Sequence, residues 1–117
     1  MNTPVSFEIA KLLKEKGFPQ PKTIEEAKKF NLQFNWYNAD GIYNAKYKLD
    51  TTIQAPTIAD VVMWLYEKHE IWIEVRNVYF TDFAPIIKGQ SRLELNRCIS
   101  PTEAYSQAIE YTLKNLI

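Results

Sequence analysis

The chain has 117 residues, of which 46% are hydrophobic and 14% are aromatic, and its 14 basic residues balance 14 acidic ones. This much apolar side chain excludes a disordered chain and is enough for one core, so we expect a single α+β domain spanning residues 1–117. A formal charge of zero makes a dedicated nucleic-acid binder unexpected, because affinity for DNA or RNA comes largely from neutralising phosphates. It also leaves little repulsion to oppose self-association.

The first predicted helix spans residues 4–16. Thr3 can cap it, Pro4 suits the first helical position, and Gly17 is placed to end it. Its apolar side chains recur with helical spacing, at Val5, Ile9, Leu12 and Leu13.

A short second helix is predicted over residues 24–30. Thr23, followed three residues later by Glu26, has the form of a capping box. A helix of this length would need packing against other elements to be stable.

The period then changes to two, which is typical of strands. Apolar and polar residues alternate over residues 32–37, a turn signal follows at residues 38–41, and a return strand covers residues 42–49. Gly41 can take the positive φ that a hairpin turn requires. The pattern predicts a β-hairpin.

Thr57 and Asp60 indicate the start of a third helix, which ends near His69. Apolar residues lie on almost every side of this segment, so we expect it to be the most buried helix.

Alternation predicts two further strands, at residues 71–76 and 92–96. Residues 80–89 contain Pro85 and Gly89 and are expected to form the loop between them. Proline is unusual inside a sheet because it cannot donate a ladder hydrogen bond.

The last helix begins at the strongest capping signal in the chain. Ser100 precedes Pro101, and Glu103 completes the box. Glu110 and Lys114 have the spacing of a favourable ion pair.

The order predicts an N-terminal helix followed by two ββα units, folded as a four-stranded antiparallel sheet with helices on one face. The similar segments 55–59 (APTIA) and 100–104 (SPTEA) begin the two later helices. They admit an internal duplication or, as we favour, convergent capping chemistry.

Strand parity predicts one dry and one wet face for this sheet. The dry face is expected to hold Phe34, Trp36, Tyr47, Ile73, Val75, Leu93 and Leu95. The wet face is expected to hold Lys46, Lys48, Glu74, Arg76, Arg92 and Glu94.

Two aromatic residues, Tyr37 and Trp72, fall on the wet face by the same parity. Exposed aromatics can mark an interface, so these two are the candidate binding residues. Alternatively, residues 80–89 fold over the two aromatics, or the true register differs from the assumed one by a single residue.

No pattern for catalysis, metal binding or a cofactor is visible. One histidine and one cysteine do not make an ordinary zinc site, and three scattered glycines do not make a phosphate loop. His69 and Cys98 are one conceivable base and nucleophile. A histidine favoured by a helix C-terminus and a small buried cysteine account for the two residues more simply.

We expect a cytoplasmic protein. Cys98 is the single cysteine and permits no internal disulfide, which fits a reducing compartment. The first residues lack the features of a signal peptide, and the longest apolar run, residues 61–66, is far below the ~20 residues that span a bilayer.

Several segments are distinctive: residues 6–18 (SFEIAKLLKEKGF), 55–69 (APTIADVVMWLYEKH), 71–75 (IWIEV) and 100–117 (SPTEAYSQAIEYTLKNLI). In these segments the chain resembles a family of small uncharacterised proteins encoded by phages and prophages of gut bacteria. The resemblance covers about half the chain, and Glu70 stands where that family usually has glycine. It implies a setting, the cytoplasm of a host cell, and transfers no functional residue.

Our first hypothesis is therefore a non-enzymatic phage accessory protein that binds another protein or a second copy of itself. An alternative is a small-molecule binder or an enzyme with an unfamiliar site, which predicts a deep pocket lined by aromatics. A third class, a nucleic-acid accessory protein, would use Lys46, Lys48, Arg76 and Arg92.

Overall fold

The computed structural model of the chain describes residues 3–33, 35–38, 41–43 and 53–117. Its helices are α1 (Phe7–Glu15), α2 (Ile24–Lys29), α3 (Ile58–His69) and α4 (Pro101–Asn115). Its strands are β1 (Trp36–Asn38), β2 (Gly41–Tyr43), β3 (Ile53–Gln54), β4 (Trp72–Tyr79), β5 (Asp82–Lys88) and β6 (Arg92–Glu94). The α+β class is confirmed.

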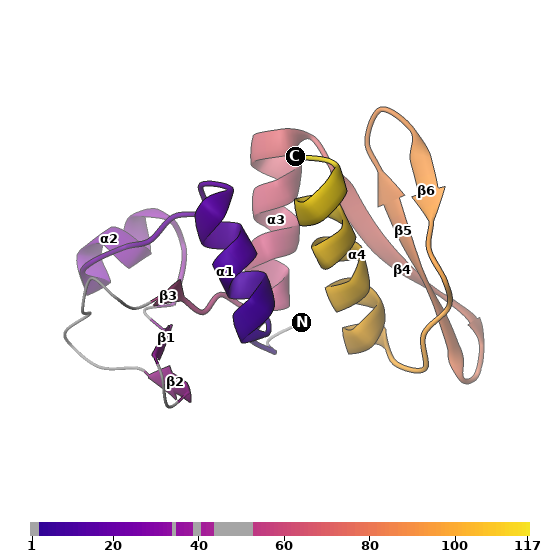
Figure 1. Ribbon diagram of the computed structural model, residues 1–117, viewed down its shortest axis with the longest axis horizontal. Helices are drawn as coiled ribbons and strands as arrows, with labels where there is room; N and C mark the ends of the chain where they lie inside the picture. The colour runs from indigo at the N-terminus through magenta and orange to yellow at the C-terminus, as the bar shows by residue number, and fades with distance from the viewer. Residues whose placement is uncertain (1–2, 34, 39–40, 44–52) are drawn as a thin grey trace.

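The strands form two sheets, so the prediction of one four-stranded sheet is wrong. One sheet has the order β2-β1-β3 and the other the order β4-β5-β6, with all neighbours antiparallel. Figure 1 shows α1, α3 and α4 between the two sheets, which lie toward opposite ends of the 43 Å long axis. The predicted hairpin is present as β1 and β2, whereas residues 44–52 of its return strand lie outside the described residues.

The segment expected to be a loop, residues 80–89, contains the central strand β5 of the second sheet. The prediction was wrong because it took Pro85 as evidence against a strand. Its carbonyl accepts a hydrogen bond from the Leu95 amide at 2.9 Å, and the N and C=O of one strand residue point to the same side. The missing N–H therefore faces the β6 side, just beyond Glu94 where β6 ends, so no bond to β4 is lost.

The first helix begins later than predicted, at Phe7 with Ser6 as its N-cap. The residues before it pair with the approach to α3: the Val5 amide donates to the Pro56 carbonyl, and the Ile58 amide donates to the Thr3 carbonyl, both at 2.9 Å. These bonds hold the segment extended.

The other helix boundaries follow the capping chemistry. Thr23, Thr57 and Ser100 each accept a hydrogen bond from the amide three residues ahead. The box of α3 is complete, because the Asp60 carboxylate accepts from the Thr57 amide at 3.0 Å. Gly17 ends the first helical segment at φ +91°, as its position predicted.

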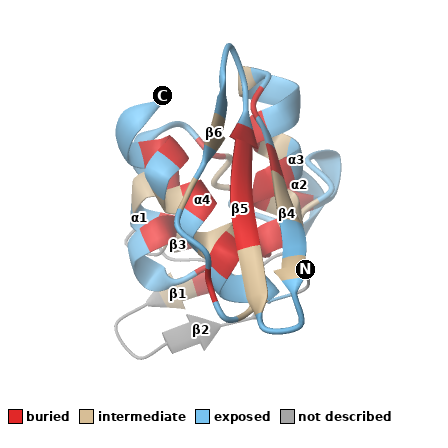
Figure 2. Ribbon diagram, turned by 90° about the vertical axis from the view of Figure 1, so that its right-hand side faces the viewer, coloured by how far each residue is buried: buried red, intermediate tan, exposed pale blue. Residues whose placement is uncertain are grey.

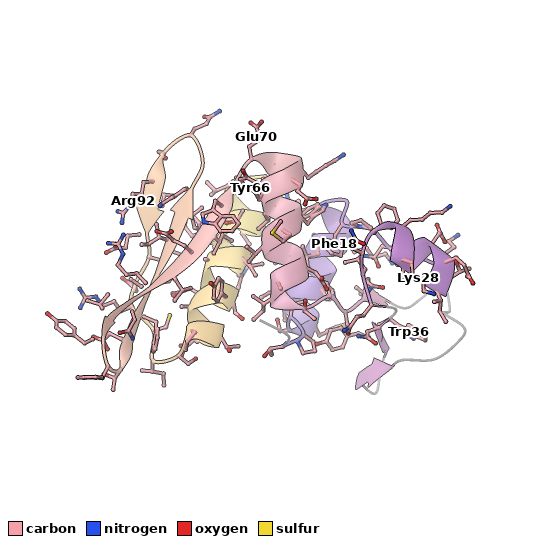
Figure 3. All side chains as sticks on the ribbon, turned by 180° about the vertical axis from the view of Figure 1, so that it is seen from behind. Phe18, Lys28, Trp36, Tyr66, Glu70 and Arg92 are labelled. Atoms are coloured by element: carbon pink, nitrogen blue, oxygen red, sulfur yellow. The ribbon has the colours of Figure 1, made fainter. Side chains whose placement is uncertain are left out.

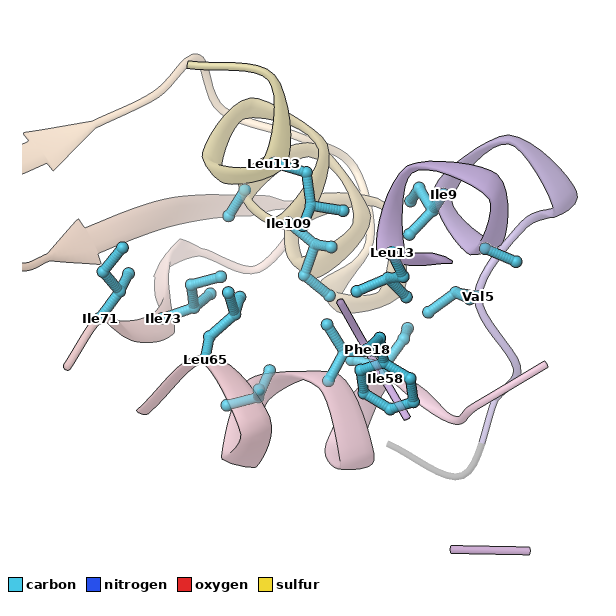
Figure 4. Packing of buried hydrophobic residues seen from close by; sticks show 14 of the residues in the cluster. Val5, Ile9, Leu13, Phe18, Ile58, Leu65, Ile71, Ile73, Ile109 and Leu113 are labelled. Atoms are coloured by element: carbon cyan, nitrogen blue, oxygen red, sulfur yellow. The ribbon is translucent and has the colours of Figure 1, made fainter. Parts of the chain in front are cut away.

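The core lies where the three long helices meet the second sheet (Figure 4). Its buried members include Ile9, Leu13, Leu65, Ile73, Ile87, Ile109 and Leu113. Trp36 and Ala27 form a separate small cluster between the first sheet and α2. None of the helices in the described ranges has the length and apolar character to span a bilayer.

Helix α3 has the smallest share of exposed residues among the four described helices, as expected, but it is two-sided. Val61 and Leu65 are buried, whereas Met63 is 45% exposed and Tyr66 is 53% exposed. The apolar residues on its outer side are therefore exposed to water, although we expected another element to cover them.

The second sheet has the predicted sidedness. Ile73 and Ile87 are buried on the helix side, and Glu74 on the outer side bonds Lys88 at 3.1 Å. Ile86 is also fully buried although its parity places it on the outer side, between Glu74 and Glu94. Figure 2 shows β5 buried along most of its length between its neighbours.

The two helix starts at Thr57 and Ser100 share capping chemistry, but the sheets associated with them differ in strand order. This difference favours convergent capping over a ββα duplication.

Replacing Leu113 by alanine should lower the free energy of unfolding by about 2–5 kcal/mol, because the side chain is fully buried and its loss leaves a cavity. Leu116→Ala is the matched control, since Leu116 is 40% exposed and should cost under about 1 kcal/mol. Urea unfolding measures both. Equal losses would mean that α4 does not face the core as described.

Candidate protein-binding surface

Tyr37 is half-buried in β1 and belongs to the first sheet. Its hydroxyl donates to the Val5 carbonyl, and its ring meets the Phe7 ring edge-to-face at 5.5 Å. Burial raises the pKa of Tyr37 above its ordinary value. The side chain ties the N-terminal segment to β1.

Trp72 begins β4 in the second sheet, so the structure does not bring the two sequence candidates together. Trp72 is 39% exposed, and its ring meets that of Tyr66 edge-to-face at 5.4 Å. Met63 lies one helical turn before Tyr66 on the same side of α3. We call Met63, Tyr66 and Trp72 the aromatic face; Figure 3 shows Tyr66 on the outer side of α3.

A groove adjoins this face at Met63. It encloses about 480 Å³ between α3, the end of α2 and the residues around them. Phe30, which is 51% exposed, and Trp64 contribute apolar walls. The Trp64 ring is held edge-to-face against Phe18 at 5.2 Å.

The groove has charged residues of both signs in its lining. Lys29 comes from α2, whereas Asp60 and Glu67 come from α3. Asp60 already accepts the Thr57 amide in the capping box. Lys29 and Glu67 are exposed and remain accessible to a bound molecule.

A second hollow of about 660 Å³ lies between the end of α3 and the turn joining β5 to β6. His69 lines it, but its Nε2 is buried and has no hydrogen-bond partner in the described part of the chain. The His69 and Trp64 rings meet edge-to-face at 4.9 Å, an arrangement in which an N–H can point at a ring face. The histidine therefore packs against Trp64, another residue of α3.

Cys98 and His69 do not form a catalytic pair. The Cys98 thiol donates to the Gln107 carboxamide oxygen at 2.9 Å, and His69 packs on Trp64. The C-terminal end of α3 and the N-terminal end of α4 lie at opposite ends of the helix layer (Figure 1). Burial, with Glu103 nearby, raises the pKa of the Cys98 thiol and lowers its reactivity.

Within the described ranges, no three or more His, Cys, Asp or Glu side chains gather as a metal site would require. The arginines proposed for nucleic acid have acidic neighbours, Arg76 at 4.0 Å from Glu74 and Arg92 at 3.4 Å from Glu94. Lys46 and Lys48 lie outside the described residues.

Comparison of the chain with protein-family models, curated proteins and solved structures found no match.

Met63, Tyr66 and Phe30 were not predicted from the sequence as surface residues. A signal for the first two was present, because apolar residues on both sides of α3 are more than one core can cover. Their separation into a buried and an exposed stripe depends on which neighbours pack against α3.

We expect Tyr37→Phe to lower the free energy of unfolding by about 0.5–1.5 kcal/mol near neutral pH, because the bond to Val5 is lost. The pKa of Tyr37 is raised above 10.0 in the folded state. The side chain therefore stabilises the folded state fully below pH 10, and this stabilisation is lost as pH rises through the folded pKa. Urea unfolding of the wild type over this pH range should show a loss in the free energy of unfolding that Tyr37→Phe does not show. Tyr111→Phe is the control, and an identical loss in wild type and Tyr37→Phe would contradict the assignment.

Proposed function

We propose that this protein is a non-enzymatic protein-binding module, encoded by a phage or prophage, whose contact surface is the aromatic face with its adjoining groove. The observation that carries the proposal is the exposed pair of Tyr66 and Trp72, in contact at 5.4 Å and joined through Met63 to the groove. Two side chains that a helix and a strand hold together form a rigid, partly apolar surface.

Aromatic residues and methionine are enriched in protein interfaces, and tryptophan and tyrosine often dominate the binding energy. Their large area is presented at low cost in conformational entropy because each has only two side-chain torsions. Trp72 and Tyr66 already contact each other, which restricts their rotamers before binding.

The groove defines what the partner should present. Its apolar walls at Phe30, Met63 and Trp64 suit one inserted apolar side chain. Lys29 and Glu67 can then form polar contacts around that anchor. We therefore expect a protein partner with an exposed apolar side chain flanked by charges of both signs.

The phage setting is supported by the resemblance described above, on residues 55–69 and 100–117. Such a protein would act in the cytoplasm of the infected cell, so host and phage proteins are the partner pool.

Affinity capture of the tagged protein from infected cells tests the proposal. Tyr66→Ala and Trp72→Ala should each weaken binding of the purified partner roughly 10- to 30-fold, because each removes an aromatic contact. Tyr111→Ala is the matched control, an exposed tyrosine on α4 away from the aromatic face. Equal affinity of all three variants would contradict the assignment of the aromatic face as the contact surface. Capture of no specific protein would contradict the protein-binding function itself.

A second candidate is binding of a small apolar molecule in the groove. Its volume of about 480 Å³ and its aromatic walls favour such a ligand.

Small aromatic compounds screened by thermal shift would test it. Such a ligand should raise the melting temperature of wild type and lose that effect in Met63→Glu, which places a charge in the groove. Met63→Leu should preserve binding because it conserves volume. Shifts of equal size in all three proteins would place the ligand elsewhere.

A further inference from the structure

The free edge of β4 is suited to pairing with a strand of another chain. β4 is the longest strand described, with eight residues, and it lies at one edge of the β4-β5-β6 sheet. No described segment pairs with its other edge. A long exposed edge presents unpaired N–H and C=O groups to another chain.

The direction of these groups follows from the bonds of β5. Phe83 exchanges backbone bonds with Cys98, and the Pro85 carbonyl accepts from Leu95, so odd residues of β5 face the β6 side. Even residues of β5 therefore bond β4, where they oppose Trp72, Glu74 and Arg76. The backbone groups of Ile73, Val75 and Asn77 accordingly turn to the free edge.

The alternating charges on the outer side of β4 are complementary to those of a second, antiparallel copy of the same strand. We propose that two copies of this chain pair antiparallel through β4, with the two-fold axis at Val75. In that register Val75 faces Val75 of the second copy, and Glu74 faces Arg76 of the second copy on the outer side of the sheet. The symmetry repeats this opposite-charge pair, and such pairs on adjacent strands are favourable.

Neighbouring registers are disfavoured by the same charges. Centring the axis on Glu74 opposes two glutamates, and centring it on Arg76 opposes two arginines. Like charges directly opposite each other destabilise strand pairs. Within one chain Arg76 Nη2 lies 4.0 Å from Glu74 Oε1, which is long for an ion pair. The Arg76 side chain is 60% exposed, so it can turn to a partner.

The ends of the strand are also complementary. Tyr66 and Trp72 lie at the start of β4, whereas Tyr79, 65% exposed, and Phe80, fully exposed, lie at its end. Antiparallel pairing brings the start of one copy beside the end of the other. The result is a continuous six-stranded sheet with aromatic contacts at both ends of the new seam.

Self-pairing goes beyond the proposed function because it uses the backbone edge of β4, whereas the groove is formed by α2, α3 and nearby residues. The two surfaces share Trp72 and Tyr66. A dimer would carry two such grooves, and a partner with two anchors would bind with a higher effective affinity.

Sedimentation velocity over a concentration series tests the pairing. Wild type should show a monomer–dimer equilibrium, and Arg76→Glu should weaken it roughly tenfold or more, because two attractive pairs become repulsive. Arg92→Glu is the matched control, with the same charge change on β6. Wild type that stays monomeric at the highest soluble concentration would overturn the proposal, as would an unchanged dimer in Arg76→Glu.

A mixing experiment tests the register itself. Glu74→Arg alone should also be weakened, whereas an equimolar mixture of Glu74→Arg and Arg76→Glu restores opposite charges at both positions. The mixture should therefore dimerise although each component does not. Failure of the mixture to pair, with both components folded by circular dichroism, would overturn this register.

Backbone participation is tested by Val75→Pro and hydrogen exchange. Proline is tolerated on an edge strand where the N–H faces out, so this variant should fold as a monomer. In wild type the Val75 and Asn77 amides should become protected as concentration rises. Unchanged exchange in the dimer would place its interface elsewhere. Partner binding in the groove, measured with Met63→Glu, tests the proposed function separately, because Met63 lines the groove and does not lie on β4.

Discussion

The burial of β5 on both of its faces is the constraint on which the second half of the molecule depends. Ile87 packs into the core on the helix side, and Ile86 is fully buried on the outer side. β4 and β6 pair with β5 on either side of it, so they form the edges of the sheet. Their charged side chains flank the apolar strip on the outer side, and Glu74 and Lys88 join across the β4–β5 pair.

Helix α3 connects this sheet to the rest of the chain. Leu65 contributes to the core, while Met63 and Tyr66 point outward beside Trp72 and the groove. The same helix therefore positions both the sheet and the surface that we assign to binding. Its N-terminal approach is fixed by the extended segment before α1, through the bond from the Ile58 amide to the Thr3 carbonyl.

The two surfaces assigned to binding differ in physical character. The groove and aromatic face offer apolar area with two accessible charges, Lys29 and Glu67, and suit a partner that inserts a side chain. The β4 edge offers backbone groups and alternating charges, and suits an extended strand. Trp72 borders both surfaces, because it begins β4 and contacts Tyr66.

The local sequence accounted well for helix starts. Thr23, Thr57 and Ser100 were identified because a capping hydroxyl acts within one turn of chain, and three residues suffice to define it. Pro85 shows the limit of such reasoning. A proline normally disfavours a central strand, and only the position where β6 stops pairing makes it harmless here.

The sequence by itself determined the α+β class, the helix caps and the sidedness of β4, because hydrogen bonds and side-chain periodicity within a few residues decide those features. Only the tertiary structure decided that the strands divide into two sheets, that Tyr37 turns to Val5, and that Tyr66 meets Trp72. Those outcomes depend on which distant segments pack together. Alternation along a strand says which side a residue faces, and carries no information about what covers that side.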